Sequence, residues 1–153
     1  MLAGRNGVGK FILGGGQVRQ EIIIDGKNFD DMEGFYCEIE KLLTKDLGWK
    51  IGRNLDAFND VLRGGFGVHE YGEPIKIIWK NFKKSKKDFG YEAIIRQYEY
   101  ILAHPHPFTD IDYVQSKLLD AKNGVGETLM DVLVEIITSN DPGHKNCMLE
   151  ILD

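Results

Sequence analysis

Three short apolar segments, separated from one another by stretches of helical periodicity, constrain the fold of this chain most. They span residues 21–24, 75–79 and 147–152, and turn residues flank the first and the last of them. The middle segment is nearly all apolar, as expected for a strand that is covered on both faces. Strands joined by helical crossovers favour a parallel sheet. The sequence therefore predicts an α/β fold with a small three-stranded parallel sheet packed with helices.

Amphipathic helices are predicted between these strands. Asp30 and Glu33 have the spacing of a capping-box-like helix start, and the helix that follows is expected to end near Gly48. Its apolar side chains recur at helical spacing: Met32, Phe35, Tyr36, Ile39, Leu42 and Leu43. The last predicted helix has a similar stripe: Leu129, Val132, Leu133, Ile136 and Ile137. Residues 1–20 are Gly-rich and predict a flexible lead-in.

The segment after Gly52 predicts a short helix with an acidic side. Asn54 is a good N-cap, and Asp56 and Asp60 stand four residues apart with Asn59 beside them. Like charges at this spacing cost a few tenths of a kcal/mol, roughly, in an isolated helix. Two carboxylates on a rigid element suit recognition of a positively charged surface. The alternative is an ordinary solvated helix face with a favourable acid in its first turn.

The same segment resembles the signature of a known family. Gly-Arg-Asn-Leu-Asp-Ala over residues 52–57, followed by Asp60, is similar to the signature of the barstar family, small intracellular inhibitors of ribonucleases. The strand ending at Trp79 resembles the next strand of that family. Three residues after it match the start of the following helix: Phe82, Ser85 and Lys86.

The resemblance continues to the end of the chain. Residues 126–135 resemble the last helix of the family, and residues 147–152 resemble its closing strand. The resemblance implies one barstar-like domain over residues 21–153. It also implies a helical insertion over about 87–124, before the last helix. This insertion has two apolar stripes of its own, separated by the His-Pro-His-Pro sequence at residues 104–107.

By resemblance, the chain is a bacterial immunity protein or antitoxin that occludes the active site of a ribonuclease toxin. Asp60 matches the family residue that enters the nuclease active site. Asp56 matches its acidic neighbour, and Glu135 matches the acid contributed by the last helix. Further matches belong to the loop and helix start that lie against the enzyme: Gly52, Asn54 and Leu55. The resemblance implies no catalytic residue, metal or cofactor in this chain.

Some residues depart from the family pattern near this helix. The type member carries aromatic side chains on the loop before Gly52 and beside Asp60, where this chain has Lys50, Ile51 and Asn59. Aromatic residues commonly anchor interfaces. Their replacement, together with a lysine that would face a cationic cleft, predicts that Lys50 and Asn59 contact a different nuclease.

Composition limits which kinds of partner the protein can bind and where in the cell it is expected. The formal net charge of −5 argues against direct nucleic-acid binding and is compatible with a basic protein partner. No apolar run approaches the length of a membrane span, and the N-terminus lacks the layout of a secretory signal. Cys37 and Cys147 are too few for a disulfide framework. We expect both to be buried or partly buried thiols, and the protein to be cytoplasmic.

Three further motifs resemble parts of other functional sites, but each lacks residues that such a site needs. Gly4 to Lys10 imitates a phosphate-binding loop without the Ser or Thr after the lysine. His104 and His106 have no cysteine or carboxylate at ligand spacing, which favours exposed loop histidines over a metal site. The lysine run over residues 80–87 has no interleaved aromatics and is typical of a solvated helix face.

Two other functions stay open from the residues alone. Asp56, Asp60 and Glu135 could form the carboxylate cluster of a metal-dependent hydrolase, although no nucleophile–base pair or metal-ligand set accompanies them. Alternatively, the chain could be a barstar-like module that binds a protein other than a nuclease. The identity of the partner is what distinguishes this module from an inhibitor.

Overall fold

The computed structural model describes residues 8–12, 18–44 and 50–153. One sheet runs through it in the order β1-β2-β3-β4. Its strands are β1 (Val8–Ile12), β2 (Val18–Asp25), β3 (Ile75–Lys80) and β4 (Cys147–Ile151). Strands β2, β3 and β4 are mutually parallel, whereas β1 is antiparallel to β2. The predicted three-stranded parallel sheet is confirmed, and β1 extends it at one edge.

Strand β1 alters the expectation that residues 1–20 are a flexible lead-in. The backbone of residues 8–12 pairs with residues 18–22, so these parts of the lead-in belong to the sheet. The helix predicted to end near Gly48 ends earlier, because α1 stops at Leu43 and Thr44 after it has an extended backbone. The glycine at position 4 of the loop-like motif lies outside the described residues.

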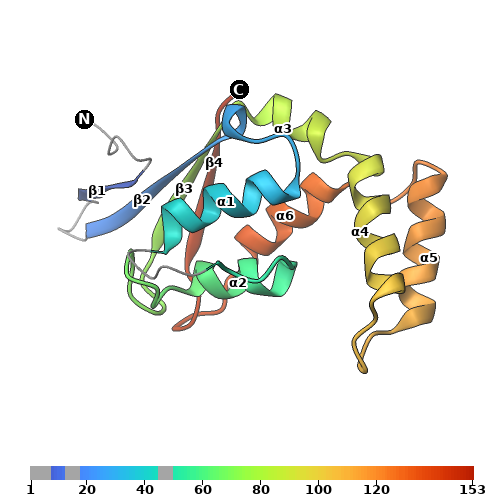
Figure 1. Ribbon diagram of the computed structural model, residues 1–153. Coiled ribbons are helices and arrows are strands. Elements are labelled where there is room, and N and C mark those ends of the chain that lie inside the picture. The colour runs from blue at the N-terminus through green and yellow to red at the C-terminus, as the bar shows by residue number, and fades with distance from the viewer. Residues whose placement is uncertain (1–7, 13–17, 45–49) are drawn as a thin grey trace.

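Helices flank the sheet and extend away from it. They are α1 (Met32–Leu43), α2 (Leu55–Arg63), α3 (Phe82–Asp88), α4 (Tyr91–Ala103), α5 (Ile111–Lys122) and α6 (Leu129–Thr138), with a 3-10 turn, η2 (Gly26–Asn28), after β2. In Figure 1, α1, α2 and α6 gather in front of the sheet. Along β3, Ile75, Ile77 and Trp79 are fully buried, while Lys76 and Ile78 are only half-buried. The sequence predicts that both faces of this strand are covered, and the face that carries Lys76 and Ile78 is only partly covered.

Aromatic rings fill the space between the sheet and the helices. Phe35 of α1 stacks on Trp79 of β3 with ring centroids 5.6 Å apart, and it meets Phe58 of α2 edge-on at 5.1 Å. All three side chains are fully buried. The indole N–H of Trp79 donates to the hydroxyl of Ser85, 3.0 Å away, so this buried polar group has a partner. Phe35 thus links α1, α2 and the sheet.

The start of α1 differs from the prediction. Asp31, not Asp30, is the N-cap, and its carboxylate accepts from the backbone N–H of Gly34 at 2.9 Å. Asp30 instead forms an ion pair with Lys84 of α3, 2.7 Å away. Lys84 also pairs with Asp88, so this member of the lysine run is not simply solvated. The neighbouring lysines are exposed: Lys80, Lys83, Lys86 and Lys87.

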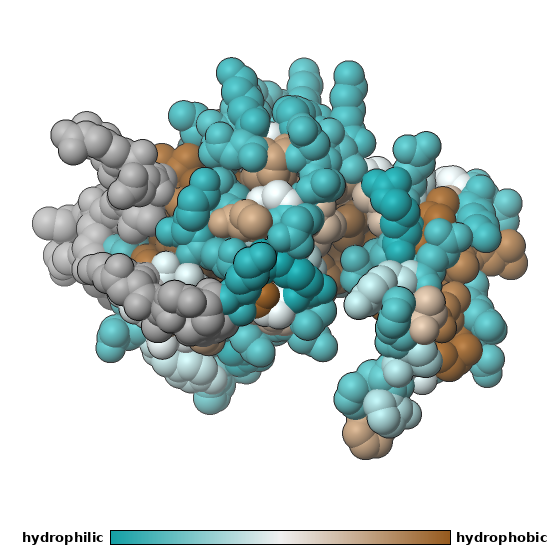
Figure 2. Space-filling model, in the orientation of Figure 1, coloured by the Kyte–Doolittle hydropathy of each residue, from teal (hydrophilic) through white to brown (hydrophobic). Residues whose placement is uncertain are grey.

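The residues of the predicted insertion form a helical hairpin. Helices α4 and α5 pack against each other and project away from the sheet (Figure 1). Apolar side chains show on the surface of this hairpin in Figure 2. Leu119 of α5 is 61% exposed. Phe108, at the tip, is 90% exposed. His104 and His106 are exposed beside it, as expected.

Three properties of the described residues bear on the alternatives above. Among them, no group of three or more His, Cys, Asp or Glu side chains is arranged to hold a metal ion. Within the same residues, no helix is long and apolar enough to cross a membrane. Cys147 is buried, but Cys37 is exposed, so the expectation of two buried or partly buried thiols is wrong for Cys37.

Candidate functional site

The acidic helix α2 begins where its sequence predicts. The side-chain oxygen of Asn54 accepts from the backbone N–H of Ala57 at 2.7 Å, which satisfies one of the unpaired donors of the first turn. Phe58, Val61 and Leu62 are buried against the core. This apolar side fixes the helix, so the opposite side is presented to solvent as a rigid surface.

Replacing the cap should loosen this surface. We expect Asn54→Ala to lower the free energy of unfolding by about 1 kcal/mol, because the Ala57 N–H loses its acceptor. Urea denaturation measures the change. Asn54→Ser is the matched control, since serine also caps helices and should retain most of the stability. Equal stability losses in the two variants would contradict a capping role for Asn54.

The candidate carboxylates all lie on the surface. Asp56 and Asp60 of α2 and Glu135 of α6 are exposed. Within the described residues, none of the three makes a hydrogen bond or an ion pair with another side chain. No described side chain therefore forms an ion pair with any of these three carboxylates.

A groove of about 340 Å3 brings two of these carboxylates together. Helix α2 supplies one wall and α6, with the turn after it, supplies the other. Its lining consists of Leu55, Asp56, Asn59, Arg63, Glu135, Ile136, Ser139, Asp141 and Lys145. Asp56 and Glu135 thus face one groove from two helices that are far apart in sequence. Asp60 is not part of the lining and lies one helical turn beyond Asp56.

The groove contains a buried lysine. The Lys145 side chain is 4% exposed. Its ammonium donates to the Asn59 side-chain oxygen at 2.7 Å and to the Ile136 carbonyl at 2.6 Å. Burial lowers the pKa of Lys145 below its ordinary value. Asn59, a candidate contact residue, is therefore half-buried and held in place by another part of the chain.

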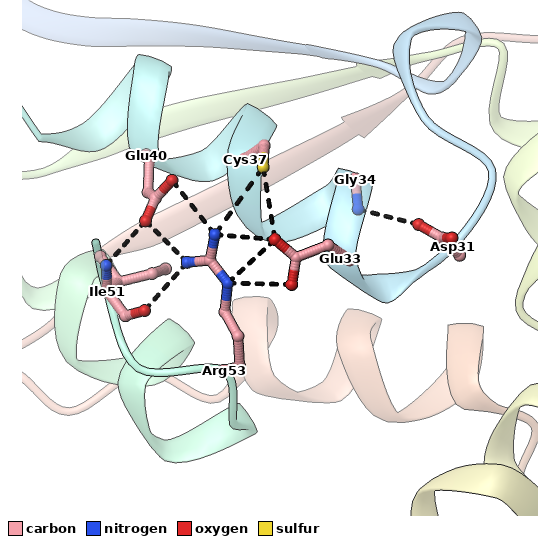
Figure 3. Close-up of polar contacts among 7 residues, drawn as sticks. All are labelled: Asp31, Glu33, Gly34, Cys37, Glu40, Ile51 and Arg53. Atoms are coloured by element: carbon pink, nitrogen blue, oxygen red, sulfur yellow. Dashed lines mark hydrogen bonds and ion pairs between the residues drawn. The ribbon is translucent and has the colours of Figure 1, made fainter.

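Arg53 anchors the loop that leads into α2 (Figure 3). Its guanidinium donates to the Glu33 carboxylate, with the shortest contact at 3.0 Å, and to the Glu40 carboxylate at 2.6 Å. It also donates to the Ile51 carbonyl at 2.9 Å. The same Glu40 oxygen accepts from the Ile51 N–H at 2.7 Å. These contacts join the residues just before Asn54 to α1, and they pair the charge of Arg53 internally.

The Arg53 cluster should make stability depend on acid pH. Hydrogen bonds from Arg53 hold the pKa values of Glu33 and Glu40 below their ordinary value of 4.5. This stabilisation is complete above about pH 4.5 and is lost as pH falls through the lowered values. Most of it should come from Glu40, because the exposed Glu33 is screened by solvent.

Arg53→Met removes the guanidinium and should flatten this dependence. We expect the free energy of unfolding of the wild type to fall more steeply between about pH 5 and pH 3 than that of the variant. Urea titrations across this range measure both slopes. Lys83→Met, which removes an exposed cation elsewhere, is the control and should keep the wild-type slope. Parallel curves for wild type and Arg53→Met would contradict the assignment.

The remaining predicted contact residues surround the same end of α2. Lys50 and Gly52 are exposed on the loop before the helix, and Leu55 is half-buried in the groove lining. Two contributors were not predicted, namely Arg53 as an anchor and Lys145 in the groove. The i, i+7 spacing of Glu33 and Glu40 on one side of α1 is a signal for the first. No local feature of the sequence indicates that Lys145 lies in the groove.

Comparison with known proteins identifies the family. The family model described as barstar (barnase inhibitor) matches residues 19–104, more than half of the chain. The match includes all but the first residue of β2, the whole of β3, and the whole of α2 with Asp56 and Asp60. It ends before α6, so it does not extend to Glu135. No curated protein matches the chain. By this match and by its fold, the chain belongs to the barstar family.

Proposed function

We propose that this protein binds a ribonuclease and occludes its active site with acidic side chains of α2. The proposal rests chiefly on Asp56 and Asp60, which are exposed on a capped helix and unpaired among the described residues. The family to which the chain belongs is described as that of a barnase inhibitor, which supports a ribonuclease as the partner.

The chemistry of a ribonuclease cleft suits these side chains. Such a cleft holds the RNA phosphate with cationic groups, and a carboxylate at the same place accepts charge-assisted hydrogen bonds from arginine or lysine. Because α2 is already folded and capped, its carboxylates need little ordering on binding. Asp60 would occupy the phosphate position, with Asp56 beside it and Glu135 reaching the partner from the other wall of the groove.

This role fits an immunity protein or antitoxin. A cytoplasmic inhibitor would protect the cell that makes a secreted or toxic nuclease. The contact surface would comprise the three acids together with Gly52, Asn54, Leu55, Asn59 and Lys50. Lys50 and Asn59 replace aromatic residues of the family pattern, and they would adapt the surface to a nuclease other than barnase.

Affinity capture tests the proposal. The immobilised wild-type chain should retain a ribonuclease activity from extracts of the cells that encode it, released by high salt. A chain carrying both Asp56→Ala and Asp60→Ala should retain far less. The control carries Glu99→Ala and Glu92→Ala, which remove two exposed acids from α4 and should not reduce capture. Retention of equal nuclease activity by all three chains, or by none, would sink the proposal.

Association should depend on salt. Opposite charges on inhibitor and enzyme speed their encounter, and salt screens this attraction. We expect the association rate to fall severalfold between about 50 and 500 mM NaCl, with a much smaller change in the dissociation rate. Stopped-flow fluorescence measures both rates. An association rate that is independent of salt would show that charge does not guide the encounter.

A further inference from the structure

Lys145 connects the two walls of the groove. Its ammonium bonds to Asn59, which lies on α2, and to the carbonyl of Ile136, which lies in the last turn of α6. The carbonyls of a last helical turn lack partners within the helix, so Lys145 also satisfies one of these acceptors. Each contacted residue adjoins a candidate acid in sequence, because Asn59 precedes Asp60 and Ile136 follows Glu135.

The turn that carries Lys145 is itself fixed. Backbone hydrogen bonds between Asp141 and Lys145, at 2.8 and 3.0 Å, close it. Arg63 of α2 approaches Asp141 at 3.8 Å. Beside this turn, the Tyr71 hydroxyl and the His144 ring nitrogen lie 2.9 Å apart. Lys145 therefore projects from a turn held on two sides, and this limits how far its ammonium can shift.

The chemistry of the Lys145 contacts is unusual for a structural link. Both acceptors are neutral oxygens, and among the described residues no carboxylate forms an ion pair with the ammonium. Burying a cation against neutral acceptors is costly, whereas an apolar side chain of similar length would fill the space without that cost. Such a contact is better suited to fixing a geometry than to adding stability.

We propose that Lys145 is a positioning residue for partner binding, holding α2 and α6 at the separation at which Asp60 and Glu135 engage one partner together. The inference rests on the proposed function, because it assigns a role to these acids. It adds that the two acids act as a unit, and that their cooperation depends on a residue that need not touch the nuclease.

The free protein provides the first test. Spin labels can be attached at positions 60 and 135 by introducing Asp60→Cys and Glu135→Cys in a Cys37→Ser chain. Pulsed electron paramagnetic resonance then measures the distance between the labels, and so the separation of α2 and α6. We expect one narrow distance distribution. Lys145→Met should broaden or shift it, whereas Asn59→Asp, which keeps an acceptor for the ammonium, should leave it narrow. The same narrow distribution in the Lys145→Met chain would overturn the inference without any reference to a nuclease.

The second test uses inhibition of the ribonuclease that the wild-type chain captures. A double-mutant cycle compares Asp60→Ala, Glu135→Gln and their combination, with Lys145 intact and with Lys145→Met. We expect Lys145→Met to weaken inhibition about tenfold and to remove the coupling between the two acids. If Lys145→Met lowered affinity but left the coupling intact, Lys145 would be a merely structural residue. Failure of the wild type to inhibit any captured nuclease would count against the proposed function instead.

A further variant controls for the chance that Lys145→Met destabilises the fold. Lys145→Met alone leaves the Asn59 oxygen without its donor, which can destabilise the fold. Combining it with Asn59→Leu also removes the unpaired Asn59 oxygen, so that only the Ile136 carbonyl in the last turn of α6 loses its donor. We expect this double variant to melt close to the wild type, yet to show the broadened distance distribution and the lost coupling. A narrow distribution in this stable variant would also contradict the inference.

Discussion

Asp60→Ala should weaken binding of the ribonuclease by at least about 2 kcal/mol, or roughly 30-fold in Kd. Asp60 is exposed on a rigid helix, and no described side chain neutralises it. Its carboxylate would be desolvated in the complex and paired with cations of the nuclease, where truncation leaves those cations unpaired. Losses of this size are typical of hot-spot residues at protein interfaces.

Asp60→Ala should change the stability of the fold very little. Because the Asp60 side chain is exposed and makes no described contact, the free energy of unfolding should stay within about 0.5 kcal/mol of the wild type. Isothermal titration calorimetry measures the affinity, and urea denaturation measures the stability. Glu99→Ala removes the same charge from α4 and serves as the control for net charge. Asp60→Ala binding as tightly as Glu99→Ala would contradict a hot spot at Asp60.

Phe35→Ala should cost about 3–5 kcal/mol of stability. Phe35 is fully buried and contacts Trp79 at 5.6 Å and Phe58 at 5.1 Å, so its removal opens a cavity between the sheet, α1 and α2. Dense packing prevents the surrounding rings from filling this space. A loss of this size is a large part of the total stability of a domain this small. Thermal and urea denaturation should both detect it.

Phe108→Ala is the matched control. Phe108 is 90% exposed at the tip of the α4–α5 hairpin, so the same truncation removes little buried area. We expect its free energy of unfolding to stay within about 0.5 kcal/mol of the wild type. If the two phenylalanine variants proved equally stable, the aromatic cluster would not be the centre of the core.

The parts of the fold that sequence predicts are those governed by local signals. Helix α2 is an example, since Asn54 caps it and Phe58, Val61 and Leu62 recur at helical spacing, all within one short segment. The parallel strands follow equally well from their apolar runs. The capping box of α6, in which Thr128 and Asp131 bond reciprocally, has a local pattern too, but with Asp where Glu or Gln is usual.

The parts that sequence misses depend on contacts between distant residues. Arg53 meets Glu33 across 20 positions, and Lys145 meets Asn59 across 86. The spacing of Glu33 and Glu40 marks one side of α1, but no spacing identifies the distant partner in either pair, because the intervening fold brings the two residues together. Strand β1 is missed for a related reason, since its pairing with β2 is visible only in the assembled sheet. The charged residues of the site can thus be predicted from local sequence, but the residues that hold them in position cannot.

The existence of helix α1 is predicted correctly, but its N-cap residue is not. Asp30 and Asp31 both precede the helix, and sequence alone gives Asp30 the spacing of a capping box with Glu33. In the structure, Lys84 of α3 holds Asp30 and Arg53 holds Glu33. Asp31 is left to cap the helix. Distant cations therefore decide between local alternatives of nearly equal propensity.

Steady-state kinetics of the captured ribonuclease test the central claim most directly. If the acids of α2 occupy the position of RNA phosphate, inhibitor and RNA exclude each other. The apparent KM for RNA should then rise linearly with inhibitor concentration while kcat stays constant, and Asp60→Ala should shift this rise to much higher concentrations. Inhibition that lowers kcat without changing KM would place the inhibitor away from the active site and contradict the claim.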